Sequence, residues 1–175
     1  EPGYLGEPEY RERSGDYWRA LFDYARALDP SRPLMFAQVE RTGLDDPAFA
    51  ACDVAGINRY YGWYEHPGQL DVAVERLAAD LDALARRHGK PVLVSEFGAD
   101  TVAGLHATCD QLFTEEYQAE LVRRYLEVIE RHPAAVGAHV WNFADFRTAQ
   151  HFRRVMLNLK GVFTRTRDPK RAAFV

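Results

Sequence analysis

Hydrophobic side chains recur at helical spacing in three stretches of the chain, each bounded by residues that start or stop helices. Ser14 is a suitable N-cap for the first stretch, which ends before Asp29. Gly89 follows the second stretch, and the third begins near Thr114 and ends before Pro133. The hydrophobic stripes are Tyr17, Trp18, Leu21, Phe22, Ala25 and Leu28; Leu70, Val74, Leu77, Leu81 and Leu84; and Tyr117, Leu121, Tyr125 and Val128. This spacing predicts three amphipathic helices.

Four short runs outside these helices are apolar on both faces and predict buried β-strands. They cover residues 34–39, 53–58, 91–95 and 135–141, and a further short extended piece is expected at 161–164. Strands of this kind that alternate with helices are typical of a parallel sheet covered by helices. A closed eight-stranded α/β barrel needs twice as many strands and typically about 250 residues. The pattern therefore predicts either a small open α/β sheet or the second half of a barrel.

Composition and charge narrow the class of protein. The 175-residue length, with 47% hydrophobic and 27% charged residues, fits one soluble globular domain. No apolar run approaches the roughly 18 residues of a membrane span, and a start at Glu1 without a signal peptide predicts a piece of a longer protein or a processed product. The net charge is −4, but the part from Arg147 onward carries eight basic residues and one acidic residue. A pI near 5.9 argues against a nucleic-acid binder, whereas the basic end suits a small acidic ligand.

The sequence lacks the motifs of a metal or cofactor site. Cys52 and Cys109 do not make a disulfide framework, and two free thiols fit a reducing cytoplasm. His106 and Cys109 could begin a metal site, but no second ligand pair follows them. No G-x-G-x-x-G follows a predicted strand, and no Walker-type phosphate loop is present. We therefore expect no metal and no cofactor.

Three predicted strands end in residues suited to chemistry, and in parallel α/β folds the reacting groups lie at the C-terminal strand ends. Glu96 follows the apolar run 91–95, where a carboxylate is costly to bury without a partner or a task. Aromatic residues gather at the strand ends: Tyr60, Tyr61, Trp63, Tyr64, Trp141 and Phe143. Rings that suit the apolar faces of sugars, beside a carboxylate, favour a retaining glycosidase with a second carboxylate about 5 Å away. Two alternatives stay open: Glu96 caps a helix or forms a salt bridge, and the rings pack in a core.

Four segments resemble, in order, the β-glucuronidases of glycoside hydrolase family 2. The segment 95–106, Ser-Glu-Phe-Gly-Ala-Asp-Thr-Val-Ala-Gly-Leu-His, is similar to the segment that carries the nucleophile of that family. The other three segments are 58–64, 140–146 and 158–165. The resemblance implies that residues 1–175 form the C-terminal half of a (β/α)8 TIM barrel. It also implies that the first barrel half and the N-terminal β-sandwich domains of the family are absent from this sequence.

The resemblance also implies roles for individual residues. Glu96 matches the nucleophile and Tyr60 the active-site tyrosine that orients it. Trp141 matches a residue that lines the sugar subsite, and in related barrels a tryptophan at this strand end often precedes a non-proline cis peptide bond. Asn58 and Tyr64 lie in the first matching segment and are expected to bind substrate.

The acid/base glutamate of the family lies in an Asn-Glu-Pro motif, whose last two residues match Glu1-Pro2. Glu7-Pro8 fits the spacing to the end of the first predicted helix better, but Gly6 precedes it where the motif has Asn. Glu1 is therefore the favoured acid/base, and Glu7 stays open as the alternative.

The resemblance places a substrate clue near the C-terminus. Asn158 and Lys160 look like the Asn-x-Lys pair that recognises the glucuronate carboxylate, and Arg154 matches a further basic position. An ammonium and an amide donor form charge-assisted hydrogen bonds to a carboxylate, which a neutral galactoside does not have. Taken alone, Lys160 reads as an ordinary solvated surface lysine.

The predicted function is hydrolysis of small-molecule β-D-glucuronides by a retaining double displacement, without a cofactor. We expect a cytoplasmic protein, a homo-oligomer when intact, that binds neither nucleic acid nor membranes, and we expect this stretch alone to be inactive without the rest of the barrel. Three alternatives stay open: a β-galactosidase-like family 2 enzyme with a neutral substrate, a non-catalytic half-barrel that binds carbohydrate, and an open α/β domain with an unrelated role.

Overall fold

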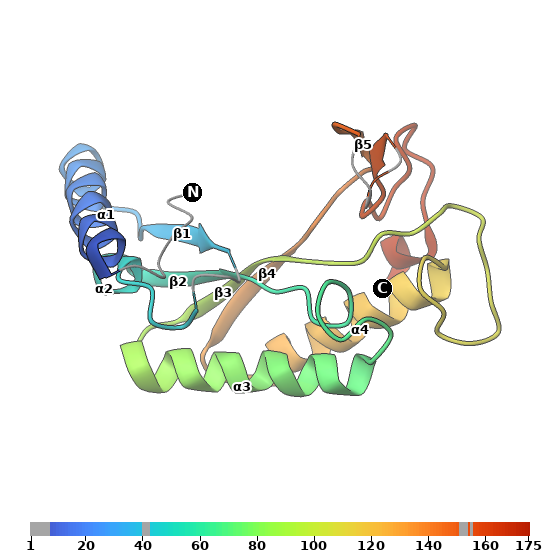
Figure 1. Ribbon diagram of the computed structural model, residues 1–175, viewed down its shortest axis with the longest axis horizontal. Helices are drawn as coiled ribbons and strands as arrows, with labels where there is room; N and C mark the ends of the chain where they lie inside the picture. Colours follow the sequence, from blue (N-terminus) through green and yellow to red (C-terminus); the bar gives the residue numbers. More distant parts are fainter. Residues whose placement is uncertain (1–7, 40–42, 151–153, 155) are drawn as a thin grey trace.

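A four-stranded parallel sheet forms the centre of the computed structural model (Figure 1). The structure describes residues 8–39, 43–150, 154 and 156–175. Its elements are α1 (Pro8–Leu28), β1 (Met35–Gln38), α2 (Ala48–Ala51), β2 (Val54–Asn58), α3 (Leu70–His88), β3 (Val92–Phe97), α4 (Glu115–Arg131), β4 (Ala135–Val140), β5 (Phe146–Arg147), β6 (Leu157–Asn158) and the 3-10 helix η2 (Arg171–Phe174). The strand order is β1-β2-β3-β4, with every neighbouring pair parallel. The predicted α/β class is confirmed.

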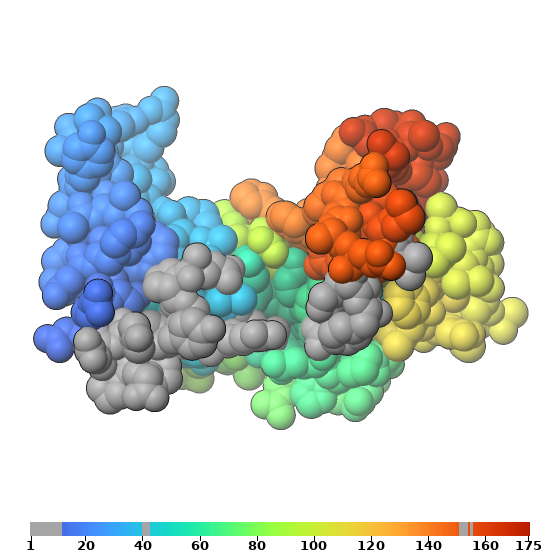
Figure 2. Space-filling view, turned by 45° about the horizontal axis from the view of Figure 1, so that its top comes forward, coloured from blue at the N-terminus to red at the C-terminus, as the bar shows by residue number. Residues whose placement is uncertain are grey.

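The two faces of the sheet are covered unequally. Helices α3 and α4 lie along one face, and α1 packs beside α2 at the β1 end (Figure 1). Figure 2 shows the surface hollowed between α1 and the C-terminal segment, with strand residues below. Strands β1 and β4 are the edges of the described sheet. An open, curved sheet with helices on one side is the arrangement expected of half a closed barrel.

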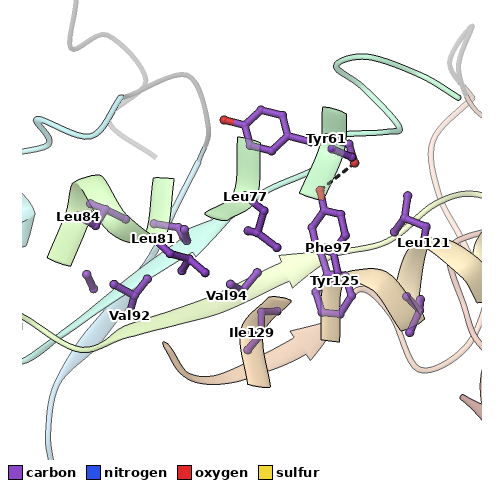
Figure 3. Close-up of a cluster of buried hydrophobic side chains, with 14 of the residues drawn as sticks. Tyr61, Leu77, Leu81, Leu84, Val92, Val94, Phe97, Leu121, Tyr125 and Ile129 are labelled. Atoms are coloured by element: carbon purple, nitrogen blue, oxygen red, sulfur yellow. Dashed lines mark hydrogen bonds between the residues drawn. The ribbon is translucent and has the colours of Figure 1, made fainter. Parts of the chain in front are cut away.

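The core lies between the sheet and the helices α3 and α4 (Figure 3). Val92 and Val94 are fully buried there, because alternate residues of β3 point to the same face. The register is irregular between Val94 and Phe97, so Phe97 also faces this core, and it stacks on Tyr125 with ring centroids 5.0 Å apart. On β4, by contrast, Val136 is 57% exposed. Within the described part of the chain, no helix has the length and apolar composition needed to cross a bilayer.

Most predicted helix ends are confirmed. Thr114 caps α4, with its hydroxyl accepting a hydrogen bond from the Tyr117 N–H at 3.2 Å. Gly89 ends α3 in the left-handed conformation at φ 61°, where a side chain is strained. The Ser14 cap is wrong: α1 begins at Pro8, so Ser14 lies inside the helix. Proline is tolerated in a first turn because its missing N–H would have no helical partner.

Two strand predictions also need correction. β3 extends to Phe97, so Glu96 is the penultimate residue of the strand rather than the residue after it. The extended piece expected at 161–164 contains only isolated bridges through Phe163. The local antiparallel pair is instead β5 with β6. β5 and β6 have only two residues each, which is too short for a hydrophobic periodicity to be detected in the sequence.

Candidate active site

The carboxyl ends of β2, β3 and β4 lie side by side and bring the sequence-predicted residues together. Asn58 pairs in register with Glu96. The Trp141 N–H donates to the Phe97 carbonyl at 2.8 Å, and the Arg59 N–H donates to the Glu96 carbonyl at 2.8 Å. Parallel strands make this possible because their carboxyl ends share one edge of the sheet.

Glu96 is held by a direct hydrogen bond from Tyr60. The Tyr60 hydroxyl lies 2.7 Å from Oε2 of Glu96, and both residues are half-buried. Burial, together with this hydrogen bond, raises the pKa of Tyr60 far above its usual value. The phenol therefore stays protonated and remains a donor to the carboxylate. The Ser95 hydroxyl donates to Oδ1 of the Asn58 amide at 2.7 Å and ties β2 to β3 beside the site.

The backbone after β3 and β4 is closely packed around Trp141. The Trp141–Asn142 peptide bond is cis, as the resemblance implied. Gly98 has φ 151°, and a Cβ there would lie 2.4 Å from the Trp141 carbonyl oxygen. Only glycine fits such an approach without movement of the backbone. The half-buried Trp141 ring packs edge to face on Phe146, with centroids 6.1 Å apart.

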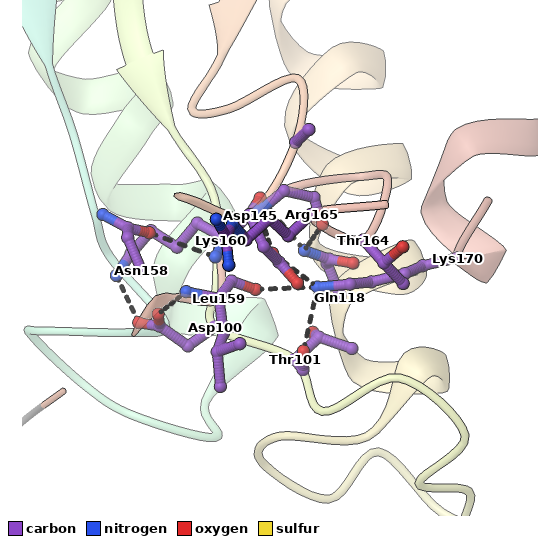
Figure 4. Close-up of polar contacts among 12 residues, drawn as sticks. Asp100, Thr101, Gln118, Asp145, Asn158, Leu159, Lys160, Thr164, Arg165 and Lys170 are labelled. Atoms are coloured by element: carbon purple, nitrogen blue, oxygen red, sulfur yellow. Dashed lines mark hydrogen bonds and ion pairs between the residues drawn. The ribbon is translucent and has the colours of Figure 1, made fainter. Parts of the chain in front are cut away.

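Lys160 lies among the aromatic rings of this site, with its side chain 1% exposed. Its ammonium donates to the Tyr64 hydroxyl at 2.9 Å. It also pairs with the carboxylate of Asp100 (Figure 4). Nζ is 4.6 Å from the centroid of the Tyr64 ring and 5.8 Å from that of Tyr60. Tyr60 is also the residue that binds Glu96. The ammonium therefore lies on the same side of the fold as the predicted nucleophile.

Two more hydrogen-bond donors, the amide of Asn158 and the guanidinium of Arg154, lie near the lysine. Oδ1 of Asn158 accepts a hydrogen bond from the Lys160 N–H at 3.1 Å, while its Nδ2 is buried and has no acceptor among the described residues. Arg154 donates to the Tyr64 hydroxyl at 3.2 Å. Together with Lys160, these groups form a cluster of donors suited to an anion.

A second buried ion pair supports the 158–161 turn from the other side. Lys170 donates to Asp145 at 2.8 Å and to the Thr101 and Leu159 carbonyls at 2.9 and 3.0 Å. Burial raises the pKa of Asp145, and the ion pair with Lys170 opposes that effect. Gln118, on α4, donates to the carbonyls of Lys160 and Gly161 at 3.2 Å each.

Sequence reasoning assigned no role to Asp100, Gln118, Asp145 or Lys170. Asp100 was visible only as an acidic residue in an otherwise apolar part of segment 95–106. Its two partners are 59 and 60 residues away, so hydrophobic pattern cannot identify them.

The remaining predictions fall elsewhere. Glu1 and Glu7 lie outside the described residues. Among the residues that are described, no group of three or more His, Cys, Asp or Glu side chains could hold a metal. His106 bonds instead to Glu116 at 2.9 Å. Of the basic C-terminal residues, Lys160 and Arg154 reach the aromatic cluster, whereas Arg167 stacks on the exposed Phe143.

The family model "Glycosyl hydrolases family 2, TIM barrel domain" matches residues 6–175. The chain is 45% identical over 166 residues to a β-glucuronidase of Paenibacillus borealis, covering 94% of this chain and 27% of that protein. Among solved structures, the Faecalibacterium prausnitzii β-glucuronidase superposes with a TM-score of 0.87 at 43% identity, covering 96% of this chain and 28% of the other.

The β-glucuronidase of Bifidobacterium dentium, complexed with coumarin-3-O-glucuronide, superposes with a TM-score of 0.90 at 41% identity. It covers 96% of this chain and 27% of its own. The chain thus spans about a quarter of the length of the proteins it resembles.

Proposed function

Because the chain belongs to glycosyl hydrolase family 2, as part of its TIM barrel domain, we propose that it supplies the nucleophile half of a β-glucuronidase barrel. In this proposal residues 1–175 are the second half of the catalytic barrel. Another segment supplies the other four strands, and N-terminal β-sandwich domains precede them. Activity then requires the complete barrel, that is, this chain together with the segment that supplies those strands.

One arrangement carries the proposal: Glu96 and Lys160 are joined through two tyrosines. Tyr60 binds Glu96, its ring lies 5.1 Å from that of Tyr64, and the Tyr64 hydroxyl binds Lys160. A nucleophilic carboxylate and a cation that are linked through the same pair of aromatic rings suit a sugar that carries its own negative charge. The complex of the Bifidobacterium dentium relative with coumarin-3-O-glucuronide supports the same substrate class.

The proposed reaction is a double displacement. The Glu96 carboxylate attacks the anomeric carbon and forms a glycosyl ester, while the acid/base glutamate protonates the departing glycosidic oxygen. The same glutamate then takes a proton from water, whose oxygen attacks the anomeric carbon and releases Glu96. Two inversions give net retention. Glu1 is the proposed acid/base, with Glu7 as the alternative.

Substrate selection in this proposal depends on N–H donors that have no acceptor among the described residues. An ammonium has three N–H donors, and the described side chains Asp100 and Tyr64 accept from Lys160. The buried Nδ2 of Asn158 likewise has no acceptor among the described residues. A glucuronate carboxylate, with two oxygens, can accept from both, and Arg154 can add a third bond. Trp141 and Asn58 complete the sugar subsite beside Glu96.

A neutral glycoside is the nearest alternative substrate. It would leave the buried donors of Asn158 and Lys160 without an acceptor, which costs affinity. Comparing nitrophenyl β-D-glucuronide with the matching galactoside decides between them, and the account predicts that the glucuronide is turned over faster. A cytoplasmic location and a homo-oligomeric state remain predictions.

Substitution of the proposed nucleophile tests the mechanism. In the complete barrel, Glu96→Gln should lower kcat for nitrophenyl β-D-glucuronide by at least about 100-fold, because no covalent intermediate can form. Glu130→Gln makes the same change at an exposed position in the last turn of α4, before the amino end of β4, and should leave kcat unchanged. A smaller loss for Glu96→Gln would exclude Glu96 as the nucleophile.

A further inference from the structure

Asp100 links the strand that carries Glu96 to the turn that carries Lys160. It is buried in the loop after β3, four residues beyond Glu96. Both carboxylate oxygens are engaged: Oδ1 accepts from the Leu159 N–H at 2.9 Å, and Oδ2 pairs with the Lys160 ammonium (Figure 4). One side chain therefore holds both the backbone of the 158–161 turn, at Leu159, and the ammonium of Lys160.

The loop that carries Asp100 is itself held at several points. The Ala99 carbonyl accepts from Gln118 at 3.0 Å, and the Thr101 N–H donates to the Leu159 carbonyl at 2.9 Å. Gly98 lies too close to Trp141 to accept a side chain. Asp100 thus has a fixed position relative to Glu96.

Lysine needs such a fixed partner. Its side chain has four flexible methylene groups, so an ammonium placed by nothing else would sample many positions. A buried ammonium without a counter-charge is also strongly disfavoured. Asp100 supplies the counter-charge, and Tyr64 supplies a second acceptor at 2.9 Å. Two fixed acceptors determine the direction of the remaining N–H.

We propose that Asp100 is a positioning residue for substrate carboxylate recognition, which aligns the Lys160 ammonium and the 158–161 turn relative to Glu96. The inference rests on the proposed glucuronidase function. Asp100 does not touch the substrate; it acts through Lys160. Competition between Asp100 and the substrate carboxylate for the lysine would have the opposite effect on KM, so the sign of the change in KM for the glucuronide separates the two roles.

The test is Asp100→Asn in the complete barrel, which keeps the size of the side chain and an acceptor for Leu159 but removes the charge. The readout is kcat/KM for nitrophenyl β-D-glucuronide divided by that for the matching β-D-glucoside, which differs only in having a hydroxymethyl group in place of the carboxylate. We expect this ratio to fall by about tenfold or more, mainly through a higher KM for the glucuronide.

Asp145→Asn is the matched control. Asp145 also pairs with a buried lysine and accepts a backbone N–H from the same turn, that of Gly161 at 3.0 Å. If Asp100 only stabilised the fold, the two variants would lower both activities alike and leave the ratio unchanged. Such a result would overturn the proposal, as would a lower KM for the glucuronide in Asp100→Asn.

A double-mutant cycle keeps this proposal separate from the proposed function. In a Lys160→Met background, adding Asp100→Asn should change the ratio by less than about twofold, because the group it positions is gone. If Lys160→Met alone leaves the ratio unchanged, carboxylate recognition by Lys160 is wrong. If Lys160→Met lowers the ratio but Asp100→Asn does not, only the positioning role is wrong.

Discussion

Lys160 and Lys170 are both fully buried, and each pairs with an aspartate that also accepts a backbone N–H from the 158–161 turn. They differ in what the remaining N–H donors of each ammonium contact. Lys170 fills all three N–H donors with Asp145 and two main-chain carbonyls. Lys160 donates to two side chains and otherwise faces the rings of Tyr60, Trp63 and Tyr64.

If Lys160 binds the substrate as proposed, burial and ion pairing do not by themselves distinguish a structural lysine from a binding lysine. An ammonium enclosed by carbonyls has no remaining capacity for a ligand. An ammonium held by side chains at the end of a sheet, with aromatic rings on its other side, keeps a donor for one. The pair therefore provides an internal comparison in which one lysine serves as the control for the other.

Removing the structural lysine should have the largest effect on stability. Lys170→Met leaves Asp145 buried without its cation, which should lower the free energy of unfolding by roughly 3–5 kcal/mol. Urea denaturation measures this loss. The glucuronide-to-glucoside ratio of the folded protein should stay within about twofold. A ratio that falls as far as it does in Lys160→Met would remove the distinction between the two lysines.

Removing Lys160, the proposed binding lysine, should change substrate selection, in addition to the stability cost of leaving Asp100 buried without its cation. Lys160→Met should lower kcat/KM for the glucuronide by roughly 10- to 200-fold, the value of a charge-assisted hydrogen bond of about 1.5–3 kcal/mol. The glucoside should lose only a few-fold. Because both substrates are assayed with one sample, the ratio does not depend on the fraction folded. Equal losses on the two substrates would contradict carboxylate recognition.

Tyr64→Phe should have an intermediate effect. The substitution removes the hydroxyl that accepts from Lys160 at 2.9 Å and Arg154 at 3.2 Å but keeps the ring. Loss of one positioning hydrogen bond, about 0.5–1.5 kcal/mol, should lower the ratio by roughly 2- to 10-fold. Steady-state kinetics on both substrates checks this, and an unchanged ratio would mean that Asp100 alone orients the lysine.

Removing the charge of Glu116, which forms an exposed hydrogen-bonded pair with His106, should have the smallest effect. The hydrogen bond from His106 is the main reason why the pKa of Glu116 falls from 4.5 to about 2. A lowered pKa in the folded state stabilises the protein above pH 4.5, and this contribution is lost as the pH falls towards 2. Glu116→Gln should therefore lower Tm slightly at neutral pH, with no difference near pH 2 and no change in the substrate ratio. Thermal unfolding across this pH range tests it; a constant difference in Tm would contradict the assignment.

The sequence alone predicted the helices and strands whose hydrophobic pattern is regular. The 3.6-residue stripe of α3 and the apolar run of β3 appear in the structure within a few residues of their predicted bounds. The start of α1 was missed because Ser14 resembles an N-cap wherever it occurs, whereas the helix continues back to Pro8. The short helix α2 has too few residues for any periodicity to be detected.

Residues of the candidate site could be predicted only where they lie in a segment that resembles a known motif. Glu96, Tyr60 and Lys160 belong to segments that resemble known ones, and the structure brings them together. Asp100 and Asp145 were given no role, because their partners are set by tertiary contacts between residues far apart in the chain. Whether a buried charge is paired is decided by the fold, and hydrophobic periodicity carries no information about it.

A crystal structure of the complete barrel with D-glucuronate bound would test the central claim most directly. The account predicts a carboxylate oxygen about 2.7–3.2 Å from Nζ of Lys160, with Nδ2 of Asn158 donating to the same group and Lys170 still bonded to Asp145. A bound sugar whose carboxylate contacts a different cation, while Lys160 keeps only its bonds to Asp100 and Tyr64, would contradict it.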